Sequence, residues 1–263
     1  MLKARILTGL ILIVAFLAAL FFAPEKLWWA LVAVVVLIGA HEWGRLAGLS
    51  APYALAYVAL TAAFAASAFW YPGYFSRTVI YAGAAAFWLI AAPLWLWRRW
   101  NPPGPAIVAV AGWLVLVPTA LALIDLRKGG AGFMLALMAT VWIADTAAYF
   151  SGRRFGRHKL APQISPGKTW EGVIGALSAV ALYAIVLIFA AHYTLGFALA
   201  LLLLVPLSIV GDLFESWIKR RAGAKDSGSL LPGHGGVLDR IDGLTATLPL
   251  AAGALLLLHR TVI

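Results

Sequence analysis

Residues 195–219 read LGFALALLLLVPLSIVGDLFESWIK, an apolar run that passes directly into a polar segment. The apolar part, 195–211, is long enough for a helix that crosses a bilayer. The polar side chains that follow share one helix face by their i, i+3, i+4, i+7 spacing: Asp212, Glu215, Ser216 and Lys219. We therefore predict one helix that crosses a membrane and carries a polar stripe out of its end.

The rest of the chain has the same apolar character. Of the 263 residues, 63% are hydrophobic and 11% are charged, whereas an average soluble domain has about 25% charged residues. Apolar runs recur from residue 6 to residue 260, and no soluble domain long enough to fold alone separates them. We predict an all-α, polytopic integral membrane protein that forms a single membrane domain over residues 1–263.

About nine stretches are candidate membrane helices by length and hydropathy. They are 6–23, 27–40, 52–70, 79–97, 106–124, 132–150, 170–191, 195–211 and 244–260. The second is short for a complete crossing, and we expect the first to stay as a helix and not to be a cleaved leader. The chain has no cysteine, which excludes disulfides and thiolate metal sites.

The basic residues predict the orientation. With the N-terminus in the cytoplasm, most of the 20 Lys and Arg residues fall on the inner side, as the positive-inside rule requires. This orientation places two long polar loops, 151–169 and 212–243, in the cytoplasm. The net charge of +10 reflects the same rule and attraction to anionic membrane lipid. We expect no nucleic-acid partner, because the basic residues are dispersed among membrane loops.

Residues 1–130 have few polar groups inside the spans and are typical of a hydrophobic scaffold. The exception is a cluster of His41, Glu42 and Arg45 just past the second span. We interpret this cluster as interfacial, and a contribution to a distant site is the alternative. Most of the ten acidic residues lie at or beyond residue 145, so the chemistry is expected in the region 140–263.

The first polar block, 142–172, reads WIADTAAYFSGRRFGRHKLAPQISPGKTWEG. Asp145 lies in the apolar helix, where a carboxylate is costly unless it is paired, hydrated or holding a cation. Ser165 before Pro166 predicts a helix start with the serine as its cap. A basic loop before a helix N-terminus favours an anion, so phosphate binding and lipid head-group anchoring both fit.

The triplet Gly167-Lys168-Thr169 in this block suggests a P-loop, whose glycine-rich backbone cradles nucleotide phosphates. The P-loop pattern requires a glycine at position 162, where this chain has proline. We therefore reject a Walker site here.

The second polar block, 212–243, reads DLFESWIKRRAGAKDSGSLLPGHGGVLDRIDG. Asp239 and Asp242 project to one side if 239–243 begins a helix, and the glycines allow close approach of the backbone to a ligand. A flexible surface loop explains the glycines equally well, but it leaves unexplained the carboxylates at the ends of two successive helices. Carboxylates with Lys and Arg nearby suggest a site for Mg²⁺ and polyphosphate at the cytoplasmic membrane face.

These two blocks resemble the phosphatidate cytidylyltransferase family, whose members are also called CDP-diacylglycerol synthases. The C-terminal signature of that family matches without a gap. The matching residues are Ser216, Lys219-Arg220, Lys225-Asp226, Pro232, His234-Gly235-Gly236, Asp239-Arg240 and Asp242. The resemblance covers about the last 120 residues, and the N-terminal scaffold resembles the family only in being hydrophobic.

The resemblance implies transfer of CMP from CTP to phosphatidate, which yields CDP-diacylglycerol and pyrophosphate. It implies an active site facing the cytoplasm in the plasma (inner) membrane, Mg²⁺ with room for a second cation, and a possible homodimer. The metal ligands it implies are Asp212, Asp239, Asp242 and Asp145. The catalytic residues it implies are Asp212, Asp239, Lys219, Lys225, Asp226 and Arg240. The substrate contacts it implies are Ser165, Lys168, Thr169, Ser216, Arg220, His234, Gly235 and Gly236.

Two other classes of membrane protein use acidic residues on helices. A CDP-alcohol phosphotransferase has a pattern of spaced aspartates with Ala-Arg after Asp-Gly, but here Asp242-Gly243 is followed by Leu-Thr-Ala-Thr. A cation or organophosphate transporter predicts acids in the middle of the membrane, whereas these lie at the span ends. We therefore favour the nucleotidyltransferase.

Overall fold

The structure is a computed structural model that describes residues 2–70, 74–230, 233 and 235–260. Its elements in chain order are α1 (Leu2–Phe22), α2 (Glu25–Ala47), α3 (Ala51–Trp70), α4 (Tyr74–Ala86), the π-helical turn η1 (Phe87–Ala91), α5 (Ala92–Arg98), α6 (Ala106–Lys128), α7 (Ala131–Phe155), β1 (Lys159–Ala161), β2 (Ser165–Thr169), α8 (Trp170–Ala191), α9 (Leu195–Arg221) and α10 (Leu238–Arg260). The fold is predominantly helical, as the apolar runs predict.

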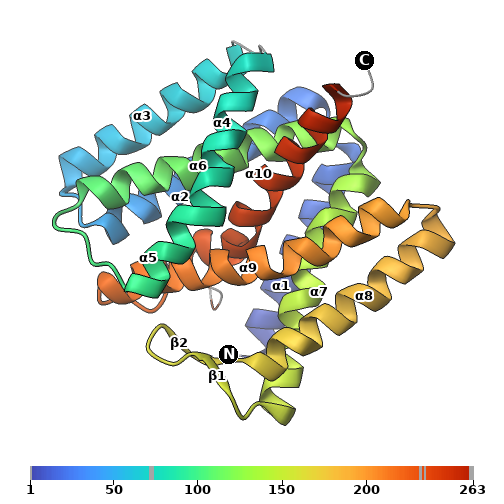
Figure 1. Cartoon of the computed structure of the whole chain (residues 1–263). Helices are drawn as coiled ribbons and strands as arrows, with labels where there is room; N and C mark the ends of the chain where they lie inside the picture. Colours follow the sequence, from blue (N-terminus) through green and yellow to red (C-terminus); the bar gives the residue numbers. More distant parts are fainter. Residues whose placement is uncertain (1, 71–73, 231–232, 234, 261–263) are drawn as a thin grey trace.

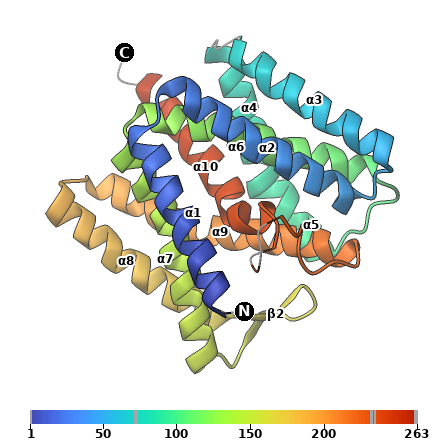
Figure 2. The ribbon, with the colours of Figure 1, turned by 180° about the vertical axis from the view of Figure 1, so that it is seen from behind.

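The helices form two groups on either side of a central pair (Figure 1). α2, α3 and α6 lie on one side and α7 with α8 on the other, while α9 and α10 pack against each other between them. The same arrangement seen from behind shows α1 lying across α7 (Figure 2). The two helices that carry the polar stripe and Asp239 with Asp242 are therefore neighbours at the centre of the molecule.

Every predicted span falls on a helix of the described chain. Seven of the described helices are long and apolar enough to cross a membrane, whereas the apolar helical stretches Gly9–Phe22 and Ala51–Ser67 are shorter than that. The predicted count of nine crossings therefore remains a prediction. The second span is longer than expected, because α2 continues through the polar cluster to Ala47 and ends at Gly48 in the left-handed conformation.

A cluster of aromatic rings sets the rotation of α9. Phe214 is fully buried, and the rings of Phe87, Trp88 and Trp95 meet it edge-on at centroid distances of 5.2, 5.7 and 5.3 Å. Trp43 stacks on it at 6.3 Å. Because such pairs add roughly 0.5–1.5 kcal/mol beyond the burial of their area, this face of α9 is held in the core. The polar stripe on the adjoining face is turned toward α10.

The close approach of α9 and α10 depends on Gly211. A Cβ at this position would lie 2.6 Å from the carbonyl oxygen of Asp242, a distance that no side chain tolerates. The absence of a side chain thus lets the first turns of α10 reach the part of α9 that carries Asp212.

The segment before α8 differs from the prediction. Residues 159–161 and 165–169 form an antiparallel hairpin, with Lys159 opposite Thr169 and Ala161 opposite Ser165. The prediction that Ser165 caps a helix was wrong, because Pro166-Gly167 continue as extended strand. The cap is Thr169, whose Oγ1 accepts a hydrogen bond of 3.1 Å from Gly172 N.

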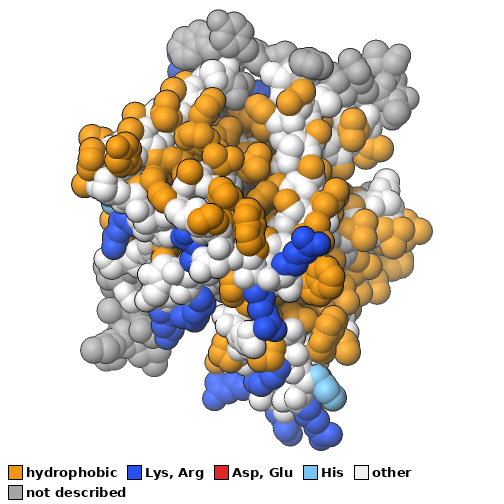
Figure 3. All heavy atoms as spheres, turned by 60° about the vertical axis from the view of Figure 1, so that its left-hand side comes forward, with side chains coloured by type: hydrophobic (Ala, Val, Ile, Leu, Met, Phe, Trp, Pro, Cys, Tyr) orange, Lys and Arg blue, Asp and Glu red, His pale blue; other side chains and the backbone are white. Residues whose placement is uncertain are grey.

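The surface is divided by residue type. Figure 3 shows one face on which hydrophobic side chains spread over the helices, while most of the visible Lys and Arg side chains gather toward the lower end. The basic residues at the end of α7 and in the hairpin are exposed there: Arg153, Arg154, Arg157 and Lys159. An apolar belt with a basic end is the surface that a bilayer and its anionic head groups favour.

A second charged group lies apart from the polar blocks. Arg77 on α4 forms a largely buried ion pair with Asp125 on α6. The hydroxyl of Tyr81 donates to the same Asp125 oxygen at 2.8 Å, and Lys128 lies 3.5 Å from the other oxygen. This group joins α4 to α6 and contains none of the predicted site residues.

Candidate active site

The polar stripe of α9 meets the first turn of α10 at Lys219. The Nζ of Lys219 lies 2.6 Å from Asp239 Oδ1 and 3.2 Å from Glu215 Oε1. All three side chains are largely buried, so the attraction between them is screened little by water. We call Glu215, Lys219 and Asp239 the Lys219 cluster. The prediction that the stripe lies on a helix, and that a helix begins near residue 239, is confirmed.

Asp239 also organises the loop that precedes it. Its Oδ2 accepts hydrogen bonds from Ser227 N at 2.9 Å, from Ser227 Oγ at 3.0 Å and from Gly236 N at 2.8 Å. Hydrogen bonds to a charged acceptor are about twice as strong as neutral ones. The Asp239 carboxylate therefore ties the 222–237 loop at Ser227 and at Gly236 to the first turn of α10.

A second group of charges lies about two turns before Lys219 on the same face of α9, around Asp212. Lys168, from strand β2, places its Nζ 2.5 Å from Asp212 Oδ2. Asp145 on α7 and Asp242 on α10 are both close enough to interact electrostatically with Asp212 and with Lys168. We call these four residues the Lys168 cluster. Three carboxylates from three helices thus interact with one ammonium group, which strand β2 supplies.

Glu215 connects the two clusters. Its carboxylate interacts electrostatically with Asp242 as well as with Asp239, and the side chain is almost entirely buried. Its Oε1 lies 3.2 Å from Lys219 Nζ as an ion pair, and this buried oxygen has no hydrogen-bond partner among the described residues. The site thus carries more acidic than basic groups at its centre.

Glu42 is a site residue that the interfacial interpretation missed. It lies on α2, only 3% exposed, and its carboxylate accepts hydrogen bonds of 2.9 Å from Ser227 Oγ, Val237 N and Leu238 N. For Glu42 the alternative, a contribution to a distant site, is the correct one. An acidic residue among Ala40, Trp43 and Gly44 in the same apolar helix was the signal available.

Glycines allow this loop to close on the two carboxylates. A Cβ at Gly236 would lie 2.1 Å from Ser227 Oγ and 2.6 Å from both Glu42 oxygens. Gly235 has a φ of +84°, a conformation that favours glycine, and a Cβ there would lie 2.7 Å from Asp239 Oδ2. The close approach predicted for these glycines is therefore to the protein's own carboxylates.

The remaining predicted residues lie around the two clusters. Ser216 donates a hydrogen bond of 3.2 Å to Asp212, and Arg220 donates to the carbonyl of Ala224 at 3.3 Å. Ser165 lies on β2, and Thr169 is buried as the cap of α8. The exposed residues are Lys225, Asp226 and Arg240. His234 lies outside the described residues. The catalytic roles predicted for Lys225, Asp226 and Arg240, and the substrate contacts predicted for the other residues of this group, remain predictions.

The donor chemistry of the Lys168 cluster suits a hard divalent cation. Mg²⁺ prefers oxygen ligands and usually takes one or two carboxylates with phosphate oxygens and water. Among the described residues, no three His, Cys, Asp or Glu side chains already stand in metal-binding geometry. Asp145, Asp212 and Asp242 nevertheless fit such an ion, because they supply carboxylate oxygens and because three carboxylates outnumber the single positive charge of Lys168.

The fold and the site together define a polytopic helical membrane protein with two linked carboxylate clusters between its central helices. Residues 3–258 match the family described as the Cytidylyltransferase family. The chain therefore belongs to the cytidylyltransferase family and is a nucleotidyltransferase.

Curated relatives agree with this assignment. The chain is 41% identical to a phosphatidate cytidylyltransferase of Pseudomonas aeruginosa over 97% of both chains. It is 37% identical to one of Haemophilus influenzae over 95% of this chain and 96% of the relative. It is 54% identical to one of Brucella suis over 42% of both chains. The similarity reaches well beyond the last 120 residues, so the N-terminal half resembles the family in more than hydrophobicity.

Proposed function

We propose that this protein transfers CMP from CTP to phosphatidate, with CDP-diacylglycerol and pyrophosphate as products. The names of the full-length relatives support this substrate pair. The observation that carries the proposal is the meeting of α9 and α10, which brings Asp212 with Asp242 and Lys219 with Asp239 into adjoining clusters. The ends of the membrane helices carry acidic and basic groups together. This combination suits a reaction between a lipid phosphate and a nucleoside triphosphate.

The reaction we propose is an in-line displacement at the α-phosphorus of CTP. A phosphate oxygen of phosphatidate forms the new P–O bond, and the bond from the α-phosphorus to the oxygen that bridges to the β-phosphate breaks. Pyrophosphate leaves with that electron pair. The attacking oxygen is already anionic near neutral pH, so no side chain has to remove a proton from it. For this reason we assign His234 to substrate contact.

Basic side chains then have the task of alignment and charge neutralisation. Lys168 and Lys219 are held in place by Asp212 and Asp239. The exposed Lys225 lies in the 222–237 loop, and the exposed Arg220 and Arg240 lie in the helices before and after it. Preorganised cations of this kind stabilise the charge that develops on transferring phosphoryl groups. Arginines add bidentate contacts that fix the orientation of the phosphates.

Mg²⁺ is the cofactor that we propose, held by Asp212 and Asp242 with Asp145 beside them. When bound, it would neutralise the phosphate oxygens of the nucleotide. Asp239 is already engaged by Lys219, Ser227 and Gly236, so its predicted role as a metal ligand, like the second cation, stays a prediction.

The membrane placement follows from the same proposal. We propose that the protein lies in the bacterial inner membrane with both clusters facing the cytoplasm, where CTP is made. The basic end of the surface and the positive-inside rule support this orientation (Figure 3). The division into a scaffold over 1–130 and a catalytic region over 140–263 is part of the proposal, with Glu42 as the scaffold's contribution to the site. The homodimer remains a prediction, tested by the mass of the purified protein in detergent.

The test uses purified protein in detergent or vesicles with phosphatidate, labelled CTP and Mg²⁺. We expect labelled CDP-diacylglycerol and pyrophosphate in equal amounts. A reaction mixture with phosphatidylcholine in place of phosphatidate is the control and should give no labelled lipid. Absence of labelled lipid from the folded wild-type protein with phosphatidate would refute the proposal.

A further inference from the structure

One exposed face of α2 changes from apolar to basic along the helix. Residues on this face follow spacings of four, three, four, three and four, which keep them in one line. They are Leu27, Leu31, Val34, Ile38, His41 and Arg45. Leu27, Leu31 and Val34 are exposed and Ile38 partly so, and His41 and Arg45 are exposed at the far end. At 1.5 Å per residue the line is about 27 Å long, close to the apolar thickness of a bilayer.

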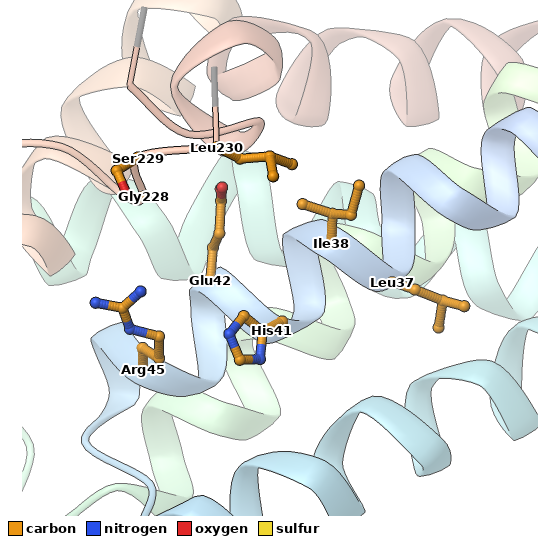
Figure 4. Close-up of a pocket in the computed structure, with 8 residues that line it drawn as sticks. All are labelled: Leu37, Ile38, His41, Glu42, Arg45, Gly228, Ser229 and Leu230. Atoms are coloured by element: carbon orange, nitrogen blue, oxygen red, sulfur yellow. The ribbon is translucent and has the colours of Figure 1, made fainter. Parts of the chain in front are cut away.

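The basic end of this line forms a wall of a pocket (Figure 4). The pocket has a volume of about 420 Å³, and α2 and the 228–230 segment face each other across it. Leu37 and Ile38 supply apolar wall on α2, and Leu230, which is 56% exposed, supplies it from the loop. An apolar side chain exposed on a polar loop adds to the area available to an acyl chain.

The polar side chains of the pocket differ in whether they have hydrogen-bond partners. Glu42 points to the loop in Figure 4, and both its oxygens accept hydrogen bonds from Ser227, Val237 and Leu238. The side chains of His41 and Arg45 form no hydrogen bond or ion pair with any described residue. The side chains of Arg45 and His41 are thus available to an anion, whereas the Glu42 carboxylate is occupied.

The pocket adjoins the active site at Glu42 and Ser227. Gly228 lines the pocket, and its neighbour Ser227 contacts both Glu42 and Asp239. A phosphate held in the pocket would therefore lie on the other side of the same loop that closes over Asp239.

We propose that this pocket receives the phosphate monoester head group of the lipid substrate, with Arg45 and His41 as its contacts. The proposal rests on the proposed function, because it names where the lipid enters that site. Arginine is suited to a phosphate since its planar guanidinium donates two parallel hydrogen bonds. Leu37, Ile38 and Leu230 contact the start of an acyl chain that continues along Leu31 and Leu27. A nucleotide has no alkyl chain to follow the line from Ile38 to Leu27, which is why we assign the pocket to the lipid.

The first test is the dependence of the rate on each substrate. We expect Arg45→Ala to raise the KM for phosphatidate in mixed micelles at least fivefold and to leave the KM for CTP unchanged. Arg45→Lys should recover part of the loss, because it keeps the charge but not the paired hydrogen bonds. Arg98→Ala is the matched control, since it removes an exposed arginine of α5 that is outside the pocket. Equal effects of Arg45→Ala and Arg98→Ala would show general attraction to the membrane and overturn the proposal.

The second test measures binding without CTP, so it does not depend on turnover. Fluorescent phosphatidate is titrated into detergent-solubilised wild-type protein and into Arg45→Ala, with fluorescent phosphatidylcholine as the control lipid. We expect the variant to bind phosphatidate at least fivefold more weakly and phosphatidylcholine as the wild type does. Displacement of the phosphatidate by low millimolar inorganic phosphate would identify a free-phosphate site and overturn the lipid assignment. If the wild-type protein turns over its substrates but Arg45→Ala binds phosphatidate as tightly as the wild type, the pocket assignment is wrong and the proposed function stands.

Discussion

Ser227 Oγ lies 2.9 Å from Glu42 Oε2, which joins helix α2 to the loop before α10 across 185 residues of sequence. The same hydroxyl lies 3.0 Å from Asp239 Oδ2, so its single hydrogen is shared between two carboxylates. Glu42 and Asp239 thus hold the loop from two sides. The shape of the active-site loop is consequently set by a residue of the N-terminal half.

Glu42→Gln should loosen this loop. A glutamine presents an NH₂ group to one of the donors Ser227, Val237 or Leu238, and a buried donor without an acceptor costs about 1–3 kcal/mol. We expect turnover to fall at least tenfold and the thermal unfolding midpoint to fall by several degrees. Glu25→Gln, an exposed change at the start of the same helix, should leave both unchanged. Wild-type turnover in Glu42→Gln would show that the contact does not support catalysis.

Gly236→Ala should damage the site by steric contact alone. The added Cβ would lie 2.1 Å from Ser227 Oγ, so the loop has to move away from Glu42 and Asp239. We expect a loss of activity of at least tenfold in the CMP-transfer assay. Gly132→Ala is the matched control, because a Cβ there meets nothing within 4 Å and alanine favours a helix. If Gly236→Ala is as active as Gly132→Ala, the loop can move away from Glu42 and Asp239 without loss of activity, and its close packing is not needed for catalysis.

The Lys168 cluster should determine the response to Mg²⁺. We expect a chelator to abolish turnover of the wild type and added Mg²⁺ to restore it. In Asp212→Asn and Asp242→Asn one carboxylate is lost, so each should lower turnover about 100-fold or shift the Mg²⁺ titration to at least tenfold higher concentration. Glu25→Gln is again the control for a lost acidic group. An unaltered Mg²⁺ titration in both asparagine variants would remove these residues from the proposed metal site.

Asp125→Asn should affect stability and not chemistry. The substitution leaves Arg77 largely buried without its charged partner and weakens the hydrogen bond from Tyr81, which we expect to cost about 1–3 kcal/mol. The measurement is the thermal unfolding midpoint in detergent, which should fall, with the KM values for both substrates unchanged well below that midpoint. A changed KM would mean that this group is coupled to the site.

Much of the fold could be predicted because membrane helices follow from local sequence patterns, namely the length of apolar runs and the spacing of polar residues. Apolar runs located the helices of the described chain, and the i, i+3, i+4, i+7 spacing placed Asp212 and Lys219 on one helix face. The sequence analysis missed the hairpin because a Ser-Pro pair such as Ser165-Pro166 is compatible both with the start of a helix and with an edge strand. The choice between them depends on Thr169, which caps α8 four residues later.

Hydropathy and helical periodicity are local properties, so the amino-acid sequence indicated a membrane protein, the residue types expected to carry its chemistry and the helix face of each. Which faces meet became apparent from the folded chain alone. It sorted the carboxylates, placing Asp212 and Asp242 with Lys168 and Asp239 with Lys219. It also brought Glu42 to the loop. Such pairings depend on close contacts between segments that are distant in the sequence. At Gly211, for example, the missing side chain leaves room for the backbone of Asp242, and no local sequence pattern predicts that contact.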